Sequence, residues 1–438
     1  MKAFKQILLA IASIAAAVPA FAAPGPEDVA AVRDFVGKNH AYAPAARAEA
    51  TRRLELLPGL VGDPARFELE AAHIAALADN GHSVLLPPQW PSRYPRSPVH
   101  LGLFADGLYV IAAPAAQAGL LRRRVIAING RPWQRVRAFY ARYQGGEPGF
   151  RDQFVPLFME TPALLAAAGL GTDRNALALT LDGGRRRRPE TVVIPARLTP
   201  FEGEQAFLGY PVLLDAAGLV AAEARPIYLQ EPERPFRLAF PAEIDGAYVQ
   251  LKATRGLEID AFLTAALAEL GARRPRNIVV DLRFNMGGDL NIARAFMRAL
   301  PRLADGGRIY AITSGRTFSA AISSLGYLKE AAAGRLTIVG EPIGDRLEFW
   351  SEGDLITLPG LGAVMLYAAE RHNYTTGCPE ADCHASIRNH PIHVRSLQPD
   401  LPTPLRFTDF LAGRDPAMDA IVRDIARRRA RLAYDTAL

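Results

Sequence analysis

Lysine is scarce in this sequence. Only five of its 51 basic residues are lysine, and the other 46 are arginine. A GC-rich genome favours arginine codons and accounts for such a bias without any functional reason. The scarcity still excludes possibilities, because any reaction that needs a lysine amine has few residues to choose from. The five are Lys2, Lys5, Lys38, Lys252 and Lys329.

Cysteine is scarcer still, since the chain has two among 438 residues. That number excludes a scaffold held by many disulfides. Cys378 and Cys383 are separated by four residues and are followed by His384, so in an oxidising compartment we expect them to close a small disulfide loop. A metal site formed with His384, His390 or His393 is the alternative, but the spacing matches no standard zinc pattern. We expect no metal.

No stretch is long and apolar enough to span a bilayer as a helix. The apolar run Ile7–Val18 follows Lys2 and Lys5 and precedes Ala20-Phe21-Ala22, which is the order of a secretory signal peptide and its cleavage site. We therefore expect residues 1–22 to be removed and the mature chain to be secreted or periplasmic. Losing two lysines lowers the formal charge from +6 to +4, so little argues for a nucleic-acid partner.

The remaining composition is that of an ordinary globular protein, with 50% hydrophobic and 22% charged residues. At this length we expect two or three domains. Residues 23–95 are predicted to be mainly helical, with helix starts at Pro26-Glu27-Asp28 and at Pro64. Short strands and turns are predicted over 96–197. These strands are Gly107–Ala112, Arg124–Ile128, Ala176–Leu181 and Thr191–Ile194.

The C-terminal part alternates strands with helices after a proline-rich connection over 198–244. Such an alternation of buried apolar strands and helices forms a mostly parallel sheet covered on both faces. We therefore predict an α/β multidomain fold with an N-terminal helical segment, a small β-rich domain and a βα-repeat domain over 245–438. The predicted strands are Ala247–Leu251, Asn277–Leu282, Arg308–Thr313 and Arg335–Gly340, and the helices are Ile259–Leu270, Leu290–Leu300 and Ala320–Ala333.

Two loops of the βα-repeat domain carry candidate catalytic groups. Each leaves the carboxyl end of a strand, where α/β sheets place their sites. In one loop Ser319 stands directly before a helix, so its hydroxyl is a candidate nucleophile and the Ala320 amide a candidate oxyanion donor. In the other loop, Gly287 and Gly288 lack a Cβ and can bring their amides close to a substrate carbonyl. Alternatively, Ser319 is only a helix N-cap, worth about 1 kcal/mol.

The order of these motifs resembles the tail-specific (carboxy-terminal processing) serine peptidase family, which includes tricorn protease. Asp281-Leu-Arg-Phe-Asn-Met-Gly-Gly precedes Arg316-Thr-Phe-Ser-Ala, and Val339-Gly-Glu-Pro, Leu358-Pro-Gly and Gln398-Pro-Asp follow in the family's order. The resemblance spans residues 245–425. It implies a peptidase with Ser319 as its nucleophile, a peptide or unfolded protein as its substrate, and no cofactor.

A second, shorter resemblance lies upstream. Ala115–Leu120 followed by Val125–Gly130 is similar to the helix, strand and turn of bacterial PDZ domains, although the usual Gly-Asp before the strand is Arg123-Arg124 here. The residues after Leu101 resemble the loop whose backbone amides hold a peptide carboxylate in that family. The resemblance implies a PDZ-like domain within 96–197 that receives a peptide tail or gates the site. The implied contacts are Gly102, Leu103 and Phe104.

The residue that would deprotonate Ser319 departs from the family. Tail-specific members carry a lysine in the loop where this chain has Arg346, and arginine does not give up its proton in proteins. Lys329 lies on the helix predicted to follow Ser319, about 15 Å along its axis, and is out of reach. Lys38 is predicted to lie on the surface of the first helical segment. Lys252 is the only lysine that these arguments leave open.

Histidine is the better candidate for the base. Tricorn-like members of the family use a histidine from an upstream segment, and Gly81-His82-Ser83 resembles that element. Because an imidazole accepts a serine proton near neutral pH, we expect His82 to be the base unless it only caps or packs. An acid is expected to orient the imidazole. Glu348 and Glu352 are the candidates, and Glu352 is preferred.

The sequence thus predicts a secreted serine peptidase with Ser319, His82 and Glu352 as its catalytic residues. Because the family lysine is missing, the alternative is a catalytically inactive relative that binds peptides or an apolar ligand. A third possibility is an esterase or amidase that acts on small molecules.

Overall fold

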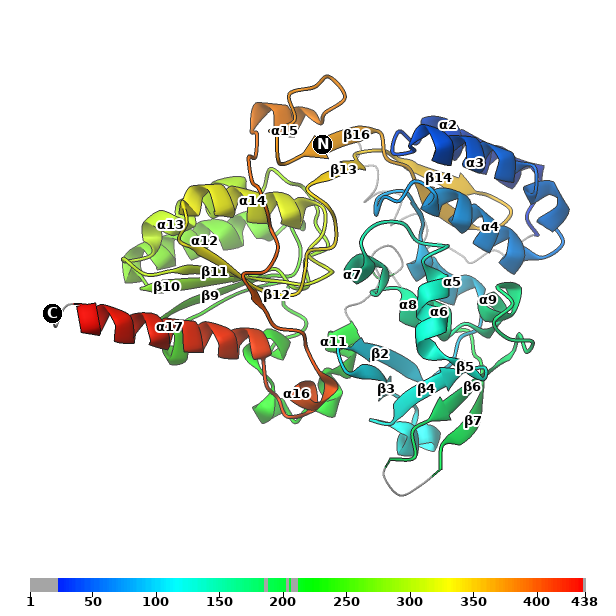
Figure 1. Cartoon of the computed structure of the whole chain (residues 1–438), viewed down its shortest axis with the longest axis horizontal. Coiled ribbons are helices and arrows are strands. Elements are labelled where there is room, and N and C mark those ends of the chain that lie inside the picture. The colour runs from blue at the N-terminus through cyan, green and yellow to red at the C-terminus, as the bar shows by residue number, and fades with distance from the viewer. Residues whose placement is uncertain (1–22, 185–187, 202–204, 206–211, 436–438) are drawn as a thin grey trace. The chain divides into compact units, whose positions relative to one another are not determined.

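The structure is a computed structural model that describes residues 23–184, 188–201, 205 and 212–435. The predicted signal peptide, residues 1–22, lies outside the described residues. The chain divides into two compact units (Figure 1). The first unit comprises residues 1–216 and 349–371, and the second comprises 217–348 and 372–438.

Helices open the first unit, as the sequence predicts. Each of the three long ones has a proline in its first turn, where the missing N–H removes no intrahelical hydrogen bond. Asp63 also caps the third by accepting a hydrogen bond from the Arg66 N–H. The helices are α2 (Pro26–Lys38), α3 (Pro44–Leu54), α4 (Pro64–Ala76) and α5 (Trp90–Arg93), with 3-10 turns η1 (Leu57–Leu60) and η2 (Pro87–Gln89).

A hairpin from much later in the chain completes this helical part. Its strands extend a short strand after α4 in the order β1-β15-β14, and Asp28 of α2 accepts a hydrogen bond from the Gly360 amide in the hairpin turn. Residues 349–371 are predicted to belong to the βα-repeat domain, but in the structure they group with the first unit. The strands are β1 (Val84–Leu85), β14 (Leu355–Leu358) and β15 (Ala363–Leu366).

The rest of the first unit is built on an antiparallel sheet in the order β2-β3-β4-β6-β7, with β5 paired to β4. The predicted strands are present, and β3, β4 and β6 have the predicted ends. The strands are β2 (His100–Phe104), β3 (Gly107–Ala112), β4 (Arg124–Ile128), β5 (Arg131–Pro132), β6 (Ala176–Leu181) and β7 (Glu190–Pro195).

Short helices interrupt this sheet between β5 and β6, in a stretch for which the sequence analysis predicted no elements. They bury aromatic residues such as Tyr140 and Phe158, whose rings lie 5.4 Å apart. The helices of this stretch are α6 (Trp133–Tyr140), α7 (Pro148–Arg151), α8 (Val155–Met159) and α9 (Pro162–Ala167). Outside it, η3 (Ala115–Leu120) lies between β3 and β4, and α11 (Val212–Asp215) follows the sheet.

The second unit contains the predicted parallel sheet, in the order β17-β12-β11-β10-β9-β8. Only β8 is antiparallel to its neighbour. Every residue of β10, β11 and β12 is buried, as expected for a sheet covered on both faces. The strands are β8 (Phe236–Ala239), β9 (Gly246–Leu251), β10 (Asn277–Asp281), β11 (Ile309–Thr313), β12 (Leu336–Gly340) and β17 (Leu401–Pro402).

Helices cover both faces of this sheet. Figure 1 shows α12, α13 and α14 on one face and α17 on the other. The α17 face is apolar, since Met418 and Ile421 pack in one cluster with Tyr248, Val279 and Tyr310 of the strands. The helices are α12 (Ile259–Arg273), α13 (Arg294–Leu303), α14 (Ala320–Ala332), α15 (Ala385–Asn389), α16 (Phe407–Leu411) and α17 (Pro416–Asp435).

The chain passes between the units at β13 (Glu348–Ser351) and β16 (Glu370–Asn373), which pair as a two-stranded sheet. The remaining 3-10 turns are η4 (Ala216–Leu219), η5 (Ala222–Ala224), η6 (Ile227–Leu229) and η7 (Ala242–Ile244). No helix in the described part of the chain combines the length and the apolar character that a membrane span requires.

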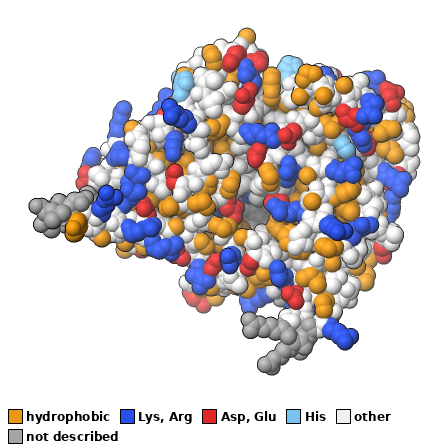
Figure 2. Space-filling model, viewed as in Figure 1, with side chains coloured by type: hydrophobic (Ala, Val, Ile, Leu, Met, Phe, Trp, Pro, Cys, Tyr) orange, Lys and Arg blue, Asp and Glu red, His pale blue; other side chains and the backbone are white. Residues whose placement is uncertain are grey.

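The basic residues do not gather in one block on the visible face. Figure 2 shows Lys and Arg side chains there interspersed with acidic and apolar ones. That mixed pattern differs from the continuous basic patch or stripe typical of nucleic-acid-binding proteins. The expectation of no nucleic-acid partner stays a prediction.

Candidate active site

Ser319 lies in the turn between β11 and α14 and has a strained backbone. Its φ is +54° and its ψ is −126°, a combination that residues with a Cβ rarely adopt. The serine occupies the N-cap position of α14, yet its side chain makes no capping hydrogen bond. The N-cap alternative is therefore not realised. Backbone strain at a residue whose side chain does not cap its helix is typical of functional sites.

Gly287, from the loop after β10, packs directly against this serine. A Cβ on Gly287 would lie 2.7 Å from the Ser319 Cβ and 3.0 Å from the Ala320 nitrogen, and its φ is +99°. Only glycine fits such a contact without displacing the backbone. Because β10 and β11 are parallel neighbours, their carboxyl ends bring the two predicted loops together.

The three amides predicted as oxyanion donors are not equivalent. The Gly287 N–H donates a hydrogen bond of 2.8 Å to the Asn285 Oδ1 and is thus already used within the loop. Among the described residues, no acceptor is found for the N–H groups of Gly288 and Ala320. The first amide of a helix has no intrahelical partner, so Ala320 points a free donor beside Ser319. The open pair is therefore Gly288 and Ala320.

Asn285 was not singled out from the sequence, although it belongs to the Asp281–Gly288 motif. Its Oδ1 also accepts a hydrogen bond of 3.2 Å from the Thr254 hydroxyl, and its carbonyl accepts one of 3.0 Å from the Phe318 N–H. One side chain thus holds the glycine loop while its backbone holds the serine loop. The Asp281–Gly288 motif, which includes this asparagine, was the available signal.

Further hydrogen bonds fix the serine loop. The Ser314 hydroxyl donates to the Arg283 carbonyl at 2.6 Å, and the Thr317 hydroxyl donates to the Leu282 carbonyl at 3.0 Å. The turn that carries Ser319 is therefore attached to the loop after β10 along its whole length. This attachment fixes Ser319 relative to the glycine loop.

A buried ionic cluster supports the same loop from below. The Arg283 guanidinium donates to Asp281 at 3.0 Å and to Asp415 at 2.8 Å. Tyr248 donates to the other Asp281 oxygen at 2.6 Å. All four residues are buried, so each charge is paired as burial requires. The cluster joins the start of the glycine loop to the start of α17.

His82 belongs to the first unit and Ser319 to the second, and each is placed only within its own unit. The His82 side chain is 7% exposed. Its ring stacks on Phe349 with the centroids 5.3 Å apart and the planes at 10°. The loop is fixed by Asn80, whose side chain accepts from the Trp350 N–H at 3.2 Å and donates to the Trp350 carbonyl at 3.0 Å. His82 is thus held rigidly against β13.

Glu352, the predicted orienting acid, directly follows β13 and is exposed. Its φ is +52°, another left-handed value in a residue with a Cβ. His82 stacks on Phe349 of β13, the strand that Glu352 follows. His82 and Glu352 therefore belong to the same part of the first unit. Glu348, the other candidate, accepts a hydrogen bond of 3.1 Å from Asn373 in the second unit. The preference for Glu352 stays a prediction.

The lysine that the sequence analysis left open, Lys252, is engaged elsewhere. Its Nζ donates to the carbonyls of Glu231 and Pro232 at 3.1 and 2.9 Å. Burial lowers the pKa of Lys252 to about 8. Arg346, which stands where the family has its lysine, is exposed. That neither residue replaces the family base stays a prediction.

The Lys252→Met variant is expected to keep peptide turnover within about 3-fold of the wild type, because the Lys252 ammonium serves as a donor to two carbonyls. A lysine base with a pKa of about 8 would lose its proton through that range, and the rate would then climb between pH 7 and 9. Initial rates measured for both proteins across that interval check this expectation. If the rate rises over this pH range in the wild type but not in the variant, Lys252 is the base.

The segment predicted to hold a peptide carboxylate is a strand and not a loop. Gly102, Leu103 and Phe104 lie in β2 and pair with β3. At the start of this strand, the Leu101 N–H already donates to the Glu160 carboxylate at 2.7 Å. Glu160 is 2% exposed and also pairs with Arg96 and His100. The Leu101 amide is thus used by an internal carboxylate, and the carboxylate-binding role of Gly102, Leu103 and Phe104 stays a prediction.

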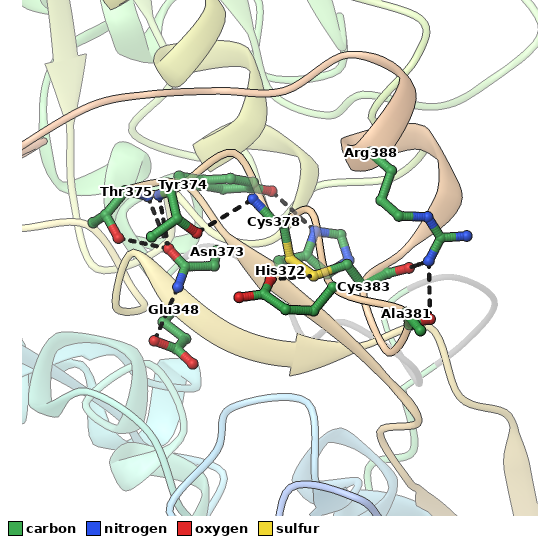
Figure 3. Close-up of a disulfide and its surroundings, with 11 residues drawn as sticks. Glu348, His372, Asn373, Tyr374, Thr375, Cys378, Ala381, Cys383 and Arg388 are labelled. Atoms are coloured by element: carbon green, nitrogen blue, oxygen red, sulfur yellow. Dashed lines mark hydrogen bonds between the residues drawn. A yellow bond between two sulfur atoms is a disulfide. The ribbon is translucent and has the colours of Figure 1, made fainter.

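Cys378 and Cys383 form a disulfide (Figure 3). Because both sulfurs are bonded, neither is available as a thiolate ligand for a metal. The figure also shows Tyr374 beside His372, whose Nδ1 lies 3.1 Å from the tyrosine oxygen. That tyrosine oxygen lies 2.7 Å from the Ser323 hydroxyl on α14. Tyr374, which precedes the disulfide loop by four residues, is therefore linked to α14.

No protein-family model and no curated protein sequence matches the chain. Among solved structures, mature CPAF in complex with lactacystin is similar, with a TM-score of 0.57 and 11% identity over 98% of this chain and 99% of that chain. A second structure of mature CPAF has a TM-score of 0.54 at 11% identity and covers 97% of both chains. The photosystem II D1 C-terminal processing protease has a TM-score of 0.38 at 13% identity, over 90% of this chain and 99% of that chain.

The chain therefore shares its fold with CPAF over nearly its whole length. This shared fold confirms the α/β multidomain class predicted from the sequence. An identity of 11% carries the fold and not the chemistry, because one fold hosts several reactions.

Proposed function

We propose that the protein is a serine peptidase that cleaves peptide bonds through an acyl-enzyme at Ser319. The observation that carries this proposal is the geometry around the serine. Its φ of +54° is strained, its hydroxyl does not cap the helix, and Gly287 packs against its Cβ. Open amides belong to Ala320, which follows the serine, and to Gly288, which follows the glycine packed against it. A nucleophile with two donors is the arrangement that acyl transfer requires.

The proposed reaction begins when the Ser319 Oγ attacks the scissile carbonyl and His82 takes its proton. The carbonyl oxygen becomes an oxyanion that accepts hydrogen bonds from the Gly288 and Ala320 amides. The tetrahedral intermediate then collapses, and the C–N bond breaks as His82 returns the proton to the leaving amine. Water repeats the sequence on the acyl-enzyme and releases Ser319. Glu352 orients the imidazole in this scheme.

The choice of His82 over a lysine rests on the lysines themselves. Lys252 is bonded to two carbonyls, and an arginine stands at the family's lysine position. His82 is held in a rigid loop against β13, as a base that must approach a fixed nucleophile has to be. These features of its own unit and of the lysines support the proposal of His82 as the base.

The finer layout is part of the same proposal. Residues 96–197 form the PDZ-like domain, and residues 245–438 form the tail-specific-peptidase-like domain. The protein acts outside the cytoplasm after removal of residues 1–22. The bonded pair Cys378–Cys383 supports this location, because disulfides persist in oxidising compartments. The substrate is a peptide or an unfolded protein.

The His82→Ala variant tests the proposal. We expect kcat for a denatured protein substrate to fall by about 10³-fold, because general base catalysis contributes about 10²- to 10⁴-fold. His390→Ala is the matched control, since His390 makes no predicted contribution, and it should stay within about 2-fold. Turnover by His82→Ala at the wild-type rate would remove His82 from the mechanism.

The missing family lysine favours one alternative, a catalytically inactive relative that binds peptides or an apolar ligand. Labelling by a fluorophosphonate separates the two. A peptidase is labelled at Ser319, as mass spectrometry of the tryptic peptide would show. An inactive relative is not labelled, hydrolyses no peptide or ester, and still binds its ligand. Hydrolysis of small esters but of no peptide would instead identify an esterase.

A further inference from the structure

A buried cation without a counter-ion lies three residues before Ser319. The Arg316 residue is 5% exposed, and its Nε is buried with no hydrogen-bond partner among the described residues. No carboxylate in the described part of the second unit pairs with its guanidinium. Burial and the nearby charge of Arg255 lower the pKa of Arg316 to about 9. Burying a charge in this way is costly unless something pairs with it.

Arg255 adds a second cation at the same place. Its Nη1 donates a hydrogen bond of 3.1 Å to the Gly287 carbonyl, and a Cβ on Gly288 would lie 3.0 Å from the Arg255 Cβ. The side chain therefore starts beside one proposed oxyanion donor, and its charge acts on Arg316. Like charges in a buried place repel each other, and an anion bound between them removes that repulsion.

Arg316 is also held in place by its backbone. Its N–H donates to the Ser314 Oγ at 3.0 Å, and that hydroxyl donates to the Arg283 carbonyl at 2.6 Å. Three residues of chain limit the distance between the Arg316 and Ser319 Cα atoms to about 11 Å. An extended substrate that is bound at Ser319 covers such a distance with about three residues.

We propose that Arg316, assisted by Arg255, binds a carboxylate of the substrate next to the scissile bond. The inference rests on the proposed peptidase function and gives its substrate class, which is a peptide with an acidic group close to the cleavage site. A guanidinium presents a planar fork of donors that matches a carboxylate in two parallel hydrogen bonds. The carboxylate has two possible sources, an Asp or Glu side chain or the C-terminus of the peptide.

Matched peptides distinguish these sources. One pair carries Glu or Gln on either side of the scissile bond, and the other carries a free or an amidated C-terminus one or two residues after it. We expect the wild type to prefer the carboxylate member of at least one pair by about 10- to 100-fold in kcat/KM, as a charge-assisted hydrogen bond supports. Arg316→Gln should reduce that preference to less than about 3-fold, because kcat/KM should fall only for the peptide with the carboxylate.

Control variants separate recognition from folding. Arg302→Gln removes the same charge from an exposed position at the far end of α13 and should keep the preference. Arg316→Lys keeps the positive charge but lacks the planar fork of donors, and it should keep part of the carboxylate preference. Because no ion pair or hydrogen bond of the Arg316 side chain is found in the described part of the chain, Arg316→Gln should unfold at the wild-type temperature or higher. A clear fall in Tm would reveal a structural role and overturn the proposal.

Peptide binding tests the same site without catalysis. Calorimetry on Ser319→Ala and on the double variant Ser319→Ala/Arg316→Gln measures the affinity for each pair. A carboxylate preference that only the second substitution removes supports the proposal even where no peptide is hydrolysed, in which case the peptidase function fails alone. An equal affinity for both members of each pair overturns the proposal. So does an equal fall of kcat/KM for acidic and neutral peptides in Arg316→Gln, because it indicates a displaced serine loop.

Discussion

Replacing Ser319 with alanine is expected to abolish peptide hydrolysis, with kcat falling by at least about 10⁴-fold. The serine hydroxyl supplies the only proposed nucleophile, and no structural hydrogen bond of that hydroxyl within its own unit is lost. The variant should therefore fold as well as the wild type. Its strained backbone at φ +54° stays strained, because alanine also has a Cβ. Hydrolysis of a denatured protein and fluorophosphonate labelling are the measurements.

The matched control is Ser324→Ala on the same helix. Ser324 is also buried, and its hydroxyl donates only to the Ala320 carbonyl one turn back, at 2.9 Å, a bond that helices lose at little cost. It should keep turnover within about 2-fold. Wild-type-like hydrolysis by Ser319→Ala would contradict the assignment, and a loss of activity in both variants would point to damage to α14.

The second large effect is expected on stability. Arg283→Met should lower the free energy of unfolding by about 3 to 5 kcal/mol, because it leaves the buried carboxylates of Asp281 and Asp415 without their shared cation. Arg283 contacts both, at 3.0 and 2.8 Å, and its guanidinium lies 4.1 Å from the centroid of the Tyr228 ring. Urea denaturation followed by circular dichroism measures the change.

Arg298→Met provides the control, because Arg298 has the same kinds of partner at the surface. It lies 4.0 Å from Glu330 and 4.8 Å from the centroid of the Tyr327 ring, and exposed pairs contribute at most about 1 kcal/mol. A loss below about 1 kcal/mol for Arg283→Met would show that the cluster is not important for stability. Since the Arg283 carbonyl also holds Ser314, turnover should fall in the remaining folded protein.

Local pattern was enough to predict the parallel sheet. A strand buried on both faces must be apolar along its whole length, and a following amphipathic helix has to cover it. The segment Asn277–Leu282 meets both conditions, and β10 (Asn277–Asp281) ends within one residue of the prediction. Residues 131–175 meet neither, because their helices have only between four and eight residues. They were therefore not predicted.

The roles of individual site residues could be predicted less well than their positions. The motif brought Gly287 to the correct loop, yet the hydrogen bond from its N–H to Asn285 depends on the loop's conformation. The residues Leu101–Phe104 resemble a carboxylate-binding loop in their types, yet the structure places them in strand β2. A buried Glu160, distant in sequence, decides what its first amide binds. A local sequence pattern does not predict such pairings.

The sequence by itself determined which chemistry is available. Five lysines, of which two lie in a predicted signal peptide, leave almost no candidate for an amine base, and the types and order of residues around Ser319 indicate acyl transfer. Only the tertiary structure decided which of these groups are free to act. It strains Ser319, uses the Gly287 amide internally, ties Lys252 to two carbonyls and buries Arg316 without a partner. Availability depends on neighbours in space, because burial and hydrogen bonding determine whether a polar group still has a bond to offer.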